Sequence, residues 1–284
     1  MQQERQRYPI KLLCRTLGVS RAGYYAWRRE QGRRRERADA ALLGDIKRIY
    51  DEHDRNYGSP RVYRELRTAG ISCSKERVER LMRDNRLRAK HAKKFKVTTQ
   101  SKHKHPVAPN VLAGRFEWPR PNQAWVGDIS YIATDEGWLY LAVLLDLFSR
   151  RVVGWAMGRR INRQLTLRAL DMAVQRRRPV SGLIHHTDQG SQYASGDYQK
   201  ALKAHGMICS MSARGRCYDN AVAESFFHTL KVELVRDRRF RSREEAMSAI
   251  FRFMEVYYNT KRMHSVLDYV SPADYERAAR LRVA

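Results

Sequence analysis

Hydrophobic residues in the central part of the chain fall into runs of the length of β-strands. The run 138–145 is apolar throughout, which predicts a central strand covered on both faces. It is flanked by β-rich runs at about 124–132 and 151–157. Helical and strand-like patterns then alternate, at about 164–177, 183–187, 195–205 and 207–211. This order predicts an α/β domain in which helices flank a mixed sheet.

The chain after this alternation is predicted to be helical. Apolar residues recur every four positions at Val222, Phe226, Leu230 and Leu234, and Asp219 or Asn220 can cap the helix that carries them. Further helices are predicted at 242–260 and from Ser271-Pro272 onward. We assign 117–240 to the α/β core and 241–284 to a C-terminal helical extension.

Residues 1–37 form a small helical segment with a basic linker. Gly18 interrupts a helical pattern that begins near residue 8, and Ser20 can cap a second helix that carries aromatic residues and arginines up to Arg29. That helix either contacts DNA or belongs to a hairpin whose aromatic residues pack on the next domain. The basic run 31–37 is interpreted as a solvated linker.

The sequence pattern of residues 38–90 predicts a module of three helices. The first covers 39–53, Ser59 can cap the second with Pro60 at its first position, and Ser74 can cap the third. Three helices with a tight middle turn resemble a helix-turn-helix module that binds DNA. The helices alone are equally consistent with a scaffold.

The charge of the chain favours a polyanionic partner. The formal net charge is +26; residues 1–110 hold 29 Lys and Arg against 12 Asp and Glu, and the remainder holds 27 against 18. Such an excess most simply indicates nucleic acid. Residues 91–116 lack acidic side chains and are interpreted as a basic arm along a phosphate backbone, or alternatively as a linker without a specific role. The candidate DNA contacts in and before this arm are Arg86, Arg88, Lys90, Lys93, Lys94 and Lys96.

The cysteines and the hydropathy favour a cytosolic protein. The four cysteines are scattered and form no Cys-x-x-Cys pair, so we expect reduced thiols rather than disulfides or a zinc site. No apolar run approaches the ~20 residues that span a bilayer, and the first seven residues lack the apolar core of a signal peptide. We therefore expect a cytosolic protein without membrane association.

Three carboxylates are candidates for a shared metal site. Asp128 lies in the β-rich run Trp125-Val-Gly-Asp128-Ile-Ser-Tyr-Ile132, where a polar group is uncommon unless it has a role. Asp188 follows a short apolar run and precedes a Gln-Gly turn, as at the end of a strand. Glu224 lies on the predicted helix, with 35 residues between it and Asp188. We expect the three to meet at one edge of the sheet; Asp146, before a turn, is interpreted as structural.

These carboxylates stand within a longer set of motifs. The motifs are Trp125-x-x-Asp128-x-Ser-Tyr-Ile132, Leu145-Asp146-Leu-Phe-Ser-Arg150, Val153-Gly-Trp155, His186-Thr-Asp-Gln-Gly-Ser-Gln-Tyr193, Gly215-x-x-Tyr218-Asp-Asn220, Glu224, Lys231 and the segment Tyr258 to Pro272. With these motifs the chain resembles the catalytic, second-reading-frame (OrfB) chain of the IS-three group of insertion-sequence transposases, which belong to the DDE class and are related to retroviral integrases. The match covers roughly residues 40–276.

The resemblance implies a fold and a set of roles. The fold is a ribonuclease H-like integrase catalytic core, with a mixed five-stranded sheet, preceded by helix-turn-helix modules. Asp128 would bridge two Mg²⁺ or Mn²⁺ ions, with Asp188 and Glu224 holding one each; oxygen ligands suit these ions. Lys231 would contact the transposon end. Arg214 and Arg216 are candidates to grip the cut strand, and Arg262 and His264 either touch DNA or pack the tail onto the core.

The expected function is Mg²⁺-dependent cleavage at the 3′ ends of a transposon, followed by direct strand transfer without a covalent protein–DNA intermediate. One alternative is a catalytically inactive DNA-binding repressor of transposition, and another is a cellular ribonuclease H-like nuclease. The expected partners are transposon-end DNA, target DNA, a further copy of this chain on the DNA, and a first-reading-frame (OrfA) protein as a fusion or a partner.

Overall fold

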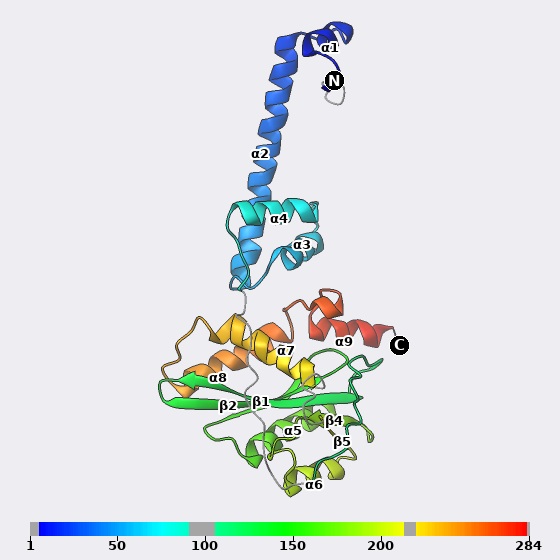
Figure 1. Cartoon of the computed structure of the whole chain (residues 1–284), viewed down its shortest axis with the longest axis vertical. Helices are drawn as coiled ribbons and strands as arrows, with labels where there is room; N and C mark the ends of the chain where they lie inside the picture. The colour runs from blue at the N-terminus through cyan, green and yellow to red at the C-terminus, as the bar shows by residue number, and fades with distance from the viewer. Residues whose placement is uncertain (1–5, 91–105, 213–219, 283–284) are drawn as a thin grey trace. The chain divides into compact units, whose positions relative to one another are not determined.

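The computed structural model describes residues 6–90, 106–212 and 220–282, and the chain divides into two compact units, Met1–Lys90 and His91–Ala284 (Figure 1). The first unit contains α1 (Ile10–Thr16), α2 (Arg21–Glu52), α3 (Ser59–Thr68) and α4 (Lys75–Asp84). The strands of the second unit are β1 (Ala124–Thr134), β2 (Gly137–Asp146), β3 (Val152–Gly158), β4 (Ile184–Thr187) and β5 (Ile208–Met211). Its helices are α5 (Arg163–Arg177), α6 (Gly196–Ala204), α7 (Ala221–Leu230), the π-helices η3 (Lys231–Val235) and η4 (Arg252–Tyr258), α8 (Arg243–Phe251), the 3₁₀-helix η5 (Ser265–Leu267) and α9 (Pro272–Leu281).

Helix α2 is continuous through the segment that was predicted to be a linker. Its side chains from 25 to 38 are exposed to solvent, apart from the partly exposed Glu30. The linker prediction for 31–37 is therefore wrong, because Arg, Gln and Glu are good helix formers even where nothing packs against them. Glu30 and Arg34 also form an ion pair of 3.6 Å one turn apart. The start of the helix follows the prediction, since the Ser20 hydroxyl accepts a hydrogen bond from the Gly23 N–H.

The three-helix module has a small core of its own. Ser74 caps α4 as predicted, accepting a hydrogen bond of 3.2 Å from the Arg77 N–H. The predicted cap at Ser59 is wrong, because α3 begins one residue earlier and Gly58 takes the capping position. Pro60 lies in the first turn, where its missing N–H has no cost. The core is formed by Leu42, Ile46, Ile49, Val62, Leu66, Val78, Leu81 and Met82.

The second unit is built on a five-stranded mixed sheet with the order β3-β2-β1-β4-β5. Strands β1, β2 and β3 are antiparallel neighbours, whereas β4 runs parallel to both β1 and β5. Strand β2 lies inside the sheet and its residues from 141 to 146 are all buried, as its apolar run predicted. The α/β core and the mixed sheet of five strands are therefore confirmed.

Helices cover both faces of this sheet. Figure 1 shows α7 and α8 on one face and α5 and α6 on the other. Successive residues of β1 point to opposite faces, so Val126 joins the core under α7 and α8, and Trp125 joins the core beside α5 and α6. A Cβ atom on Gly154 of β3 would lie 2.7 Å from the Ala173 Cβ of α5, so the close approach of this helix requires glycine.

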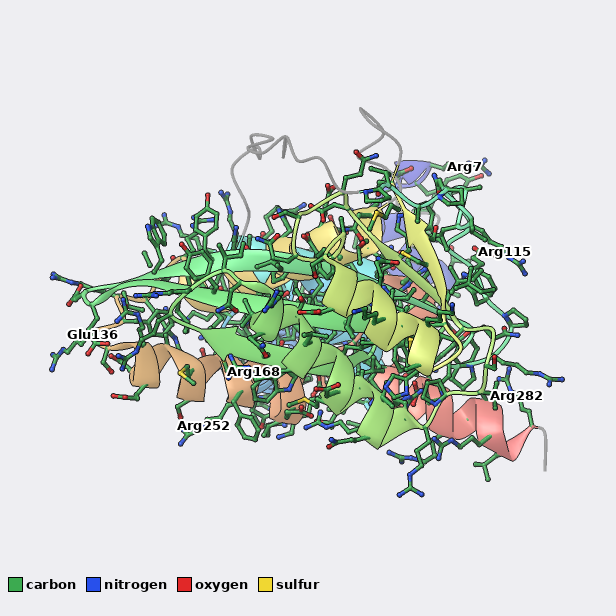
Figure 2. The ribbon with its side chains drawn as sticks, turned by 90° about the horizontal axis from the view of Figure 1, so that it is seen from below. Arg7, Arg115, Glu136, Arg168, Arg252 and Arg282 are labelled. Carbon is green, nitrogen blue, oxygen red and sulfur yellow. The ribbon has the colours of Figure 1, made fainter. Side chains whose placement is uncertain are left out.

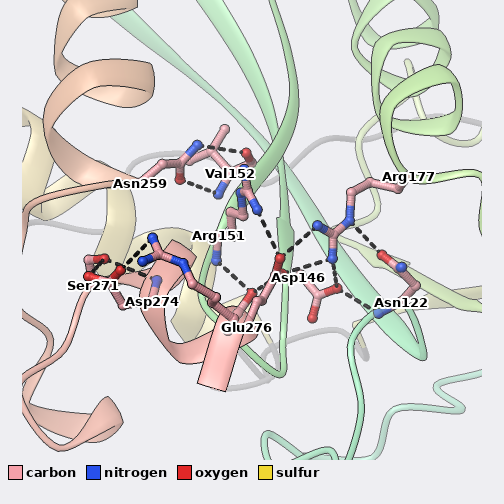
Figure 3. A network of polar contacts seen from close by, with 11 residues as sticks. Asn122, Asp146, Arg151, Val152, Arg177, Asn259, Ser271, Asp274 and Glu276 are labelled. Carbon is pink, nitrogen blue, oxygen red and sulfur yellow. Dashed lines mark hydrogen bonds and ion pairs between the residues drawn. The ribbon is translucent and has the colours of Figure 1, made fainter. Parts of the chain in front are cut away.

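The C-terminal helices belong to the same folded unit. Ala246, Ile250 and Met254 are buried in the core that also contains β1 and β2. Helix α9 is held by Glu276, whose carboxylate lies 2.8 Å from the Arg177 guanidinium and 2.9 Å from that of Arg151 (Figure 3).

Asp146 lies in the same polar network and has a structural role, as we interpreted. Its Oδ2 accepts a hydrogen bond of 2.7 Å from the Asn122 N–H, and its Oδ1 accepts one of 2.8 Å from the Phe148 N–H. Both bonds fasten the turns at the ends of β1 and β2. Of the four cysteines, Cys14, Cys73 and Cys209 are free thiols, and Cys217 lies outside the described residues. No helix in the described parts of the chain is long and apolar enough to cross a bilayer.

Candidate active site

Two of the three predicted carboxylates are brought together by the pairing of β1 with β4. In this parallel pair the last matched residues are Gly127 and Thr187. The next residue on each strand is an aspartate, Asp128 on β1 and Asp188 directly after β4. The sheet therefore places both aspartates at the point where β4 ends and β1 continues with β2 as its only paired strand.

The turn after β4 fixes the Asp188 side chain. Its Oδ1 accepts a hydrogen bond of 2.9 Å from the Gly190 N–H. A Cβ atom on residue 190 would lie 2.9 Å from the same oxygen, so glycine is needed for this close approach. Gln189 donates a hydrogen bond of 2.9 Å to the Ser212 carbonyl, which ties the turn to the end of β5.

Glu224 approaches the aspartates from the first turn of α7. The apolar face of this helix, including Phe226 and Leu230, is buried against the sheet, which leaves Glu224 exposed. Asn220, at the start of the helix, donates a hydrogen bond of 3.4 Å to the Gly127 carbonyl. Asn220 occupies the capping position of α7 as predicted, but its side chain makes no capping hydrogen bond and instead ties α7 to β1. Asp219, the other predicted cap, lies outside the described residues.

The electrostatics of Asp128 reflect the three carboxylates together. Burial, followed by the charge of Asp188, raises the pKa of Asp128 to about 8. Glu224 adds to this effect, while Lys231 and a hydrogen bond of 2.7 Å from the Ile129 N–H oppose it. Although Glu224 is exposed, partial desolvation of its carboxyl raises its pKa. Negative charges that repel one another in this way create a favourable place for a cation.

Lys231 lies beside this carboxylate group, at the point where α7 passes into the π-helix η3. Its ammonium nitrogen lies 5.3 Å from the centre of the Tyr131 ring. Burial lowers the pKa of Lys231, and the charge of Asp128 acts in the opposite direction. The side chain is thus held between an aromatic ring and the carboxylate of β1.

Tyr193 is a residue of this region to which sequence reasoning gave no role. Its side chain is 2% exposed, and its hydroxyl has no hydrogen-bond partner among the described residues. Burial raises its pKa, and the charges of Tyr198, Asp128 and Asp188 raise it further. The only signal in the sequence was its place at the end of the motif that contains Asp188.

The donor set of the site fits Mg²⁺ or Mn²⁺. Within residues 6–90, 106–212 and 220–282, no three His, Cys, Asp or Glu side chains are already gathered as a set of metal ligands. The chemistry of the donors is nevertheless that of a hard cation, because Asp128, Asp188 and Glu224 offer carboxylate oxygens without sulfur or imidazole. The raised pKa of Asp128 reflects burial first and the charges of Asp188 and Glu224 second, and a bound divalent cation would favour the charged carboxylate against both.

The other predicted DNA contacts have different positions. Arg86 and Arg88 are exposed and Lys90 is partly exposed, at the end of the first unit. By contrast, Arg262 and His264 are 5% and 9% exposed. Arg262 forms an ion pair of 2.6 Å with Glu233, and its Nη1 lies 3.3 Å from the His264 Nε2. The structure therefore favours packing of the tail over DNA contact for these two. Outside the described residues lie Lys93, Lys94, Lys96, Arg214 and Arg216.

Known proteins resemble this chain over almost its whole length. Families described as Integrase core domain match residues 119–217 and 224–279, and an HTH-like domain family matches 36–95. The chain is 44% identical over 263 residues to an insertion element IS600 uncharacterized 31 kDa protein of Shigella sonnei, covering 93% of this chain and 97% of that protein. It is 42% identical over 282 residues to the transposase InsF for insertion sequence IS3A of Escherichia coli (strain K12), covering 97% of this chain and 96% of that protein.

The chain also aligns with a structure of the HTLV-2 integrase catalytic core domain in complex with magnesium. The alignment covers 55% of this chain and 97% of the HTLV-2 chain, with 17% identity and a TM-score of 0.41. The matches to the integrase core and HTH-like families agree with the transposase name of the second relative. The chain belongs to the insertion-sequence transposases of the IS3 type, with an integrase catalytic core preceded by an HTH-like domain.

Proposed function

We propose that this transposase cleaves DNA at the 3′ ends of its element in a reaction that depends on Mg²⁺, and then joins the new 3′-OH directly to another phosphodiester. The observation that carries the proposal is the meeting of Asp128 and Asp188 where the β1–β4 pairing ends, with the charge of Glu224 acting on Asp128. Carboxylates that converge on one point of a sheet edge suit phosphoryl transfer, which requires charge neutralisation and positioning.

Each carboxylate has a distinct place in this proposal. Asp128 would hold both of two divalent ions, Asp188 one of them and Glu224 the other. When bound, such ions activate the attacking oxygen and stabilise the leaving oxygen. The chain itself orients the ligands: Gly190 fixes the Asp188 carboxylate, and Asn220 holds the start of the Glu224 helix against β1. Lys231 supplies a positive charge for a DNA phosphate beside Asp128.

The DNA partners follow from charge and fold. The end of the HTH-like domain in sequence carries further positive charge, on the exposed Arg86 and Arg88 and the partly exposed Lys90. In the second unit, Arg115, Arg252 and Arg282 extend from the surface into solvent (Figure 2). We propose that transposon-end DNA and target DNA are bound by such positive surfaces, that at least two copies act together on two ends, and that a first-reading-frame protein is a fusion or partner.

The alternative of a repressor without catalysis predicts binding without cleavage. A labelled duplex containing an end of the element is incubated with the full chain and Mg²⁺, and the products are separated under denaturing conditions. We expect a nick that exposes the 3′ end, joined products, and no protein bound covalently to DNA.

The variants test the assigned residues directly. Asp188→Asn should abolish cleavage, whereas Asp197→Asn, which alters an exposed carboxylate on α6, should cleave like the wild type. Binding of the end duplex without any nick would favour the repressor, and a covalent adduct would exclude direct transfer.

A further inference from the structure

Two aromatic side chains lie exposed together near the β1–β2 turn. Tyr131 on β1 is 44% exposed and Trp138 on β2 is 49% exposed. Their ring centres lie 4.9 Å apart with an interplanar angle of 81°, an edge-to-face pair. Buried aromatic pairs stabilise a core, but this pair leaves large apolar ring surfaces in water. Such surfaces suggest a ligand with a flat face.

The pair lies close to the catalytic carboxylates. Tyr131 follows Asp128 by three residues on the same strand, which corresponds to about 10 Å along a β-strand. Side-chain alternation places the two residues on opposite faces of the sheet, so a ligand reaches both around the edge of β1. Strand β4 pairs with β1 only as far as Gly127, so on this side of β1 no strand among the described residues lies beside Asp128 and Tyr131, whereas β2 pairs with the other side. A DNA strand whose phosphate reaches Asp128 would therefore have nucleotides within reach of the rings.

A cation connects the two positions. The Lys231 ammonium nitrogen lies 5.3 Å from the centre of the Tyr131 ring, and this lysine is close enough to Asp128 for their charges to interact. A positive charge next to an exposed aromatic ring is the combination found where proteins bind single-stranded nucleic acid, with the cation on the phosphate and the ring on the base.

The end of the hairpin is held in place by α8. The Arg243 guanidinium donates a hydrogen bond of 3.1 Å to the Trp138 carbonyl, and the Arg243 N–H donates one of 3.0 Å to the Glu136 carboxylate. Figure 2 shows Glu136 at the far end of the β1–β2 hairpin. These bonds fix the backbone that carries Trp138, so the rings can receive a ligand with little loss of conformational freedom.

We propose that Tyr131 and Trp138 form a stacking platform for an unpaired base at the cleaved end of the DNA. This platform rests on the function proposed above, because it gives a binding place to the base next to the reacting phosphate. A stacked base would hold the terminal nucleotides apart from their complement and fix the 3′ end over the carboxylates. Every base has an aromatic face, so the platform tolerates different sequences. A second protein chain fits less well, because Lys231 adjoins the rings and the chain carries a net charge of +26.

The direct test is photo-crosslinking in the full chain. End duplexes carrying 5-iodouracil at each of the last nucleotides are irradiated with the protein in Ca²⁺, and the crosslinked residues are identified by mass spectrometry. We expect a crosslink to Tyr131 or Trp138 from a terminal position. It should be lost in the double variant Tyr131→Leu, Trp138→Leu and retained in Tyr131→Phe. Phe251→Ala, which removes an aromatic ring that is 43% exposed on α8, serves as the control and should crosslink like the wild type.

A binding measurement provides the second readout. We expect the wild type to prefer an end with unpaired terminal bases over a fully paired end by at least about fivefold, since stacking one base on an aromatic ring contributes about 1–3 kcal/mol. The double leucine variant should lose this preference. Absence of a crosslink to either ring, or a preference that survives the leucine substitutions, overturns the proposal. Cleavage by the same preparations is measured separately. Crosslinking without cleavage would support the stacking platform and reject the catalytic proposal. Cleavage without crosslinking would support the catalytic proposal and reject the stacking platform.

Discussion

Removal of the Glu276 charge is predicted to weaken the anchoring of α9 to the catalytic unit. Glu276 is 2% exposed and accepts hydrogen bonds from Arg177, Arg151 and Ser149 (Figure 3). The Arg177 side chain is itself only 8% exposed, and the Asp146 carboxylate lies 3.5 Å from it. The substitution Glu276→Gln keeps the shape of the side chain but leaves the buried guanidinium with one fewer counter-ion.

The expected loss follows from the burial of both partners. Removing one partner of a buried ion pair costs about 3–5 kcal/mol. Gln keeps one acceptor oxygen and Asp146 remains, so we expect the lower end of this range, about 3 kcal/mol. For a unit of this size, 1 kcal/mol corresponds to roughly 2–4 °C, so the Tm should fall by roughly 6–12 °C.

The pH dependence has a definite sign. Burial alone would raise the pKa of Glu276, but the hydrogen bonds and charges of Arg177, Ser149 and Arg151 hold it below its ordinary value of 4.5. The contribution of its charge is therefore complete above about pH 4.5 and is lost as the pH falls through the lower pKa of the folded state. Burial raises the pKa of Asp146, but that carboxylate is present in both proteins. The difference in Tm between the wild type and Glu276→Gln should shrink below pH 4.5.

Thermal unfolding followed by tryptophan fluorescence measures this effect. Four of the five tryptophans, Trp118, Trp125, Trp138 and Trp155, lie in the second unit, so the signal reports its unfolding. The control is Asp197→Asn, which breaks an exposed pair of 3.1 Å with Arg163 and should cost at most ~1 kcal/mol. Equal Tm values for the two variants at neutral pH would refute the assignment of Glu276 as a buried anchor.

Three further predictions concern other parts of the chain. Glu233→Gln should lower the stability of the second unit by about 3 kcal/mol in denaturant unfolding, because it leaves the buried Arg262 unpaired; a change in DNA affinity without a loss of stability would contradict the packing role. The double variant Arg88→Gln, Lys90→Gln should reduce the slope of log affinity against log salt concentration by up to about 1.8, at about 0.9 for each phosphate contact; an unchanged slope would exclude both as contacts. Gly190→Ala should slow cleavage at least tenfold with little change in Tm, because the new Cβ would displace the Asp188 carboxylate; kinetics like those of the wild type would show that this carboxylate tolerates movement.

Local patterns predicted the elements that carry the site. The apolar run of β2 and the β-rich run around Asp128 both form strands, because their residues suit a buried pleated surface. Asp188 follows its strand directly, as the turn residues after it indicated. Such predictions succeed because strand and turn preferences depend mainly on neighbouring residues.

Features that depend on distant residues were not predictable in the same way. The pairing of Gly127 with Thr187 joins residues 60 positions apart, and it alone determines that Asp128 and Asp188 are neighbours. The role of Arg262 depends on Glu233, a partner 29 residues away in sequence. The motif that contains Arg262 was visible, but whether it faces DNA or the core depends on where Glu233 lies in the fold.

The helical state of α2 shows a different limit. A run of charged residues is compatible with both a solvated linker and an exposed helix, because neither has an apolar stripe. In the structure helix propensity prevails, since the helix is already nucleated by the cap at Ser20 and by the packed turns around Leu42.

We propose that Asp128, Asp188 and Glu224 act as one catalytic group on DNA. The single-turnover rate of cleavage of a labelled end duplex in Mg²⁺ is measured for the wild type and for Glu224→Gln, together with the DNA affinity and the Tm of both. We expect the variant to bind the duplex and unfold like the wild type but to cleave it at least a thousandfold more slowly, which corresponds to about 4 kcal/mol in the barrier. Cleavage by Glu224→Gln at the rate of the wild type would contradict this proposal.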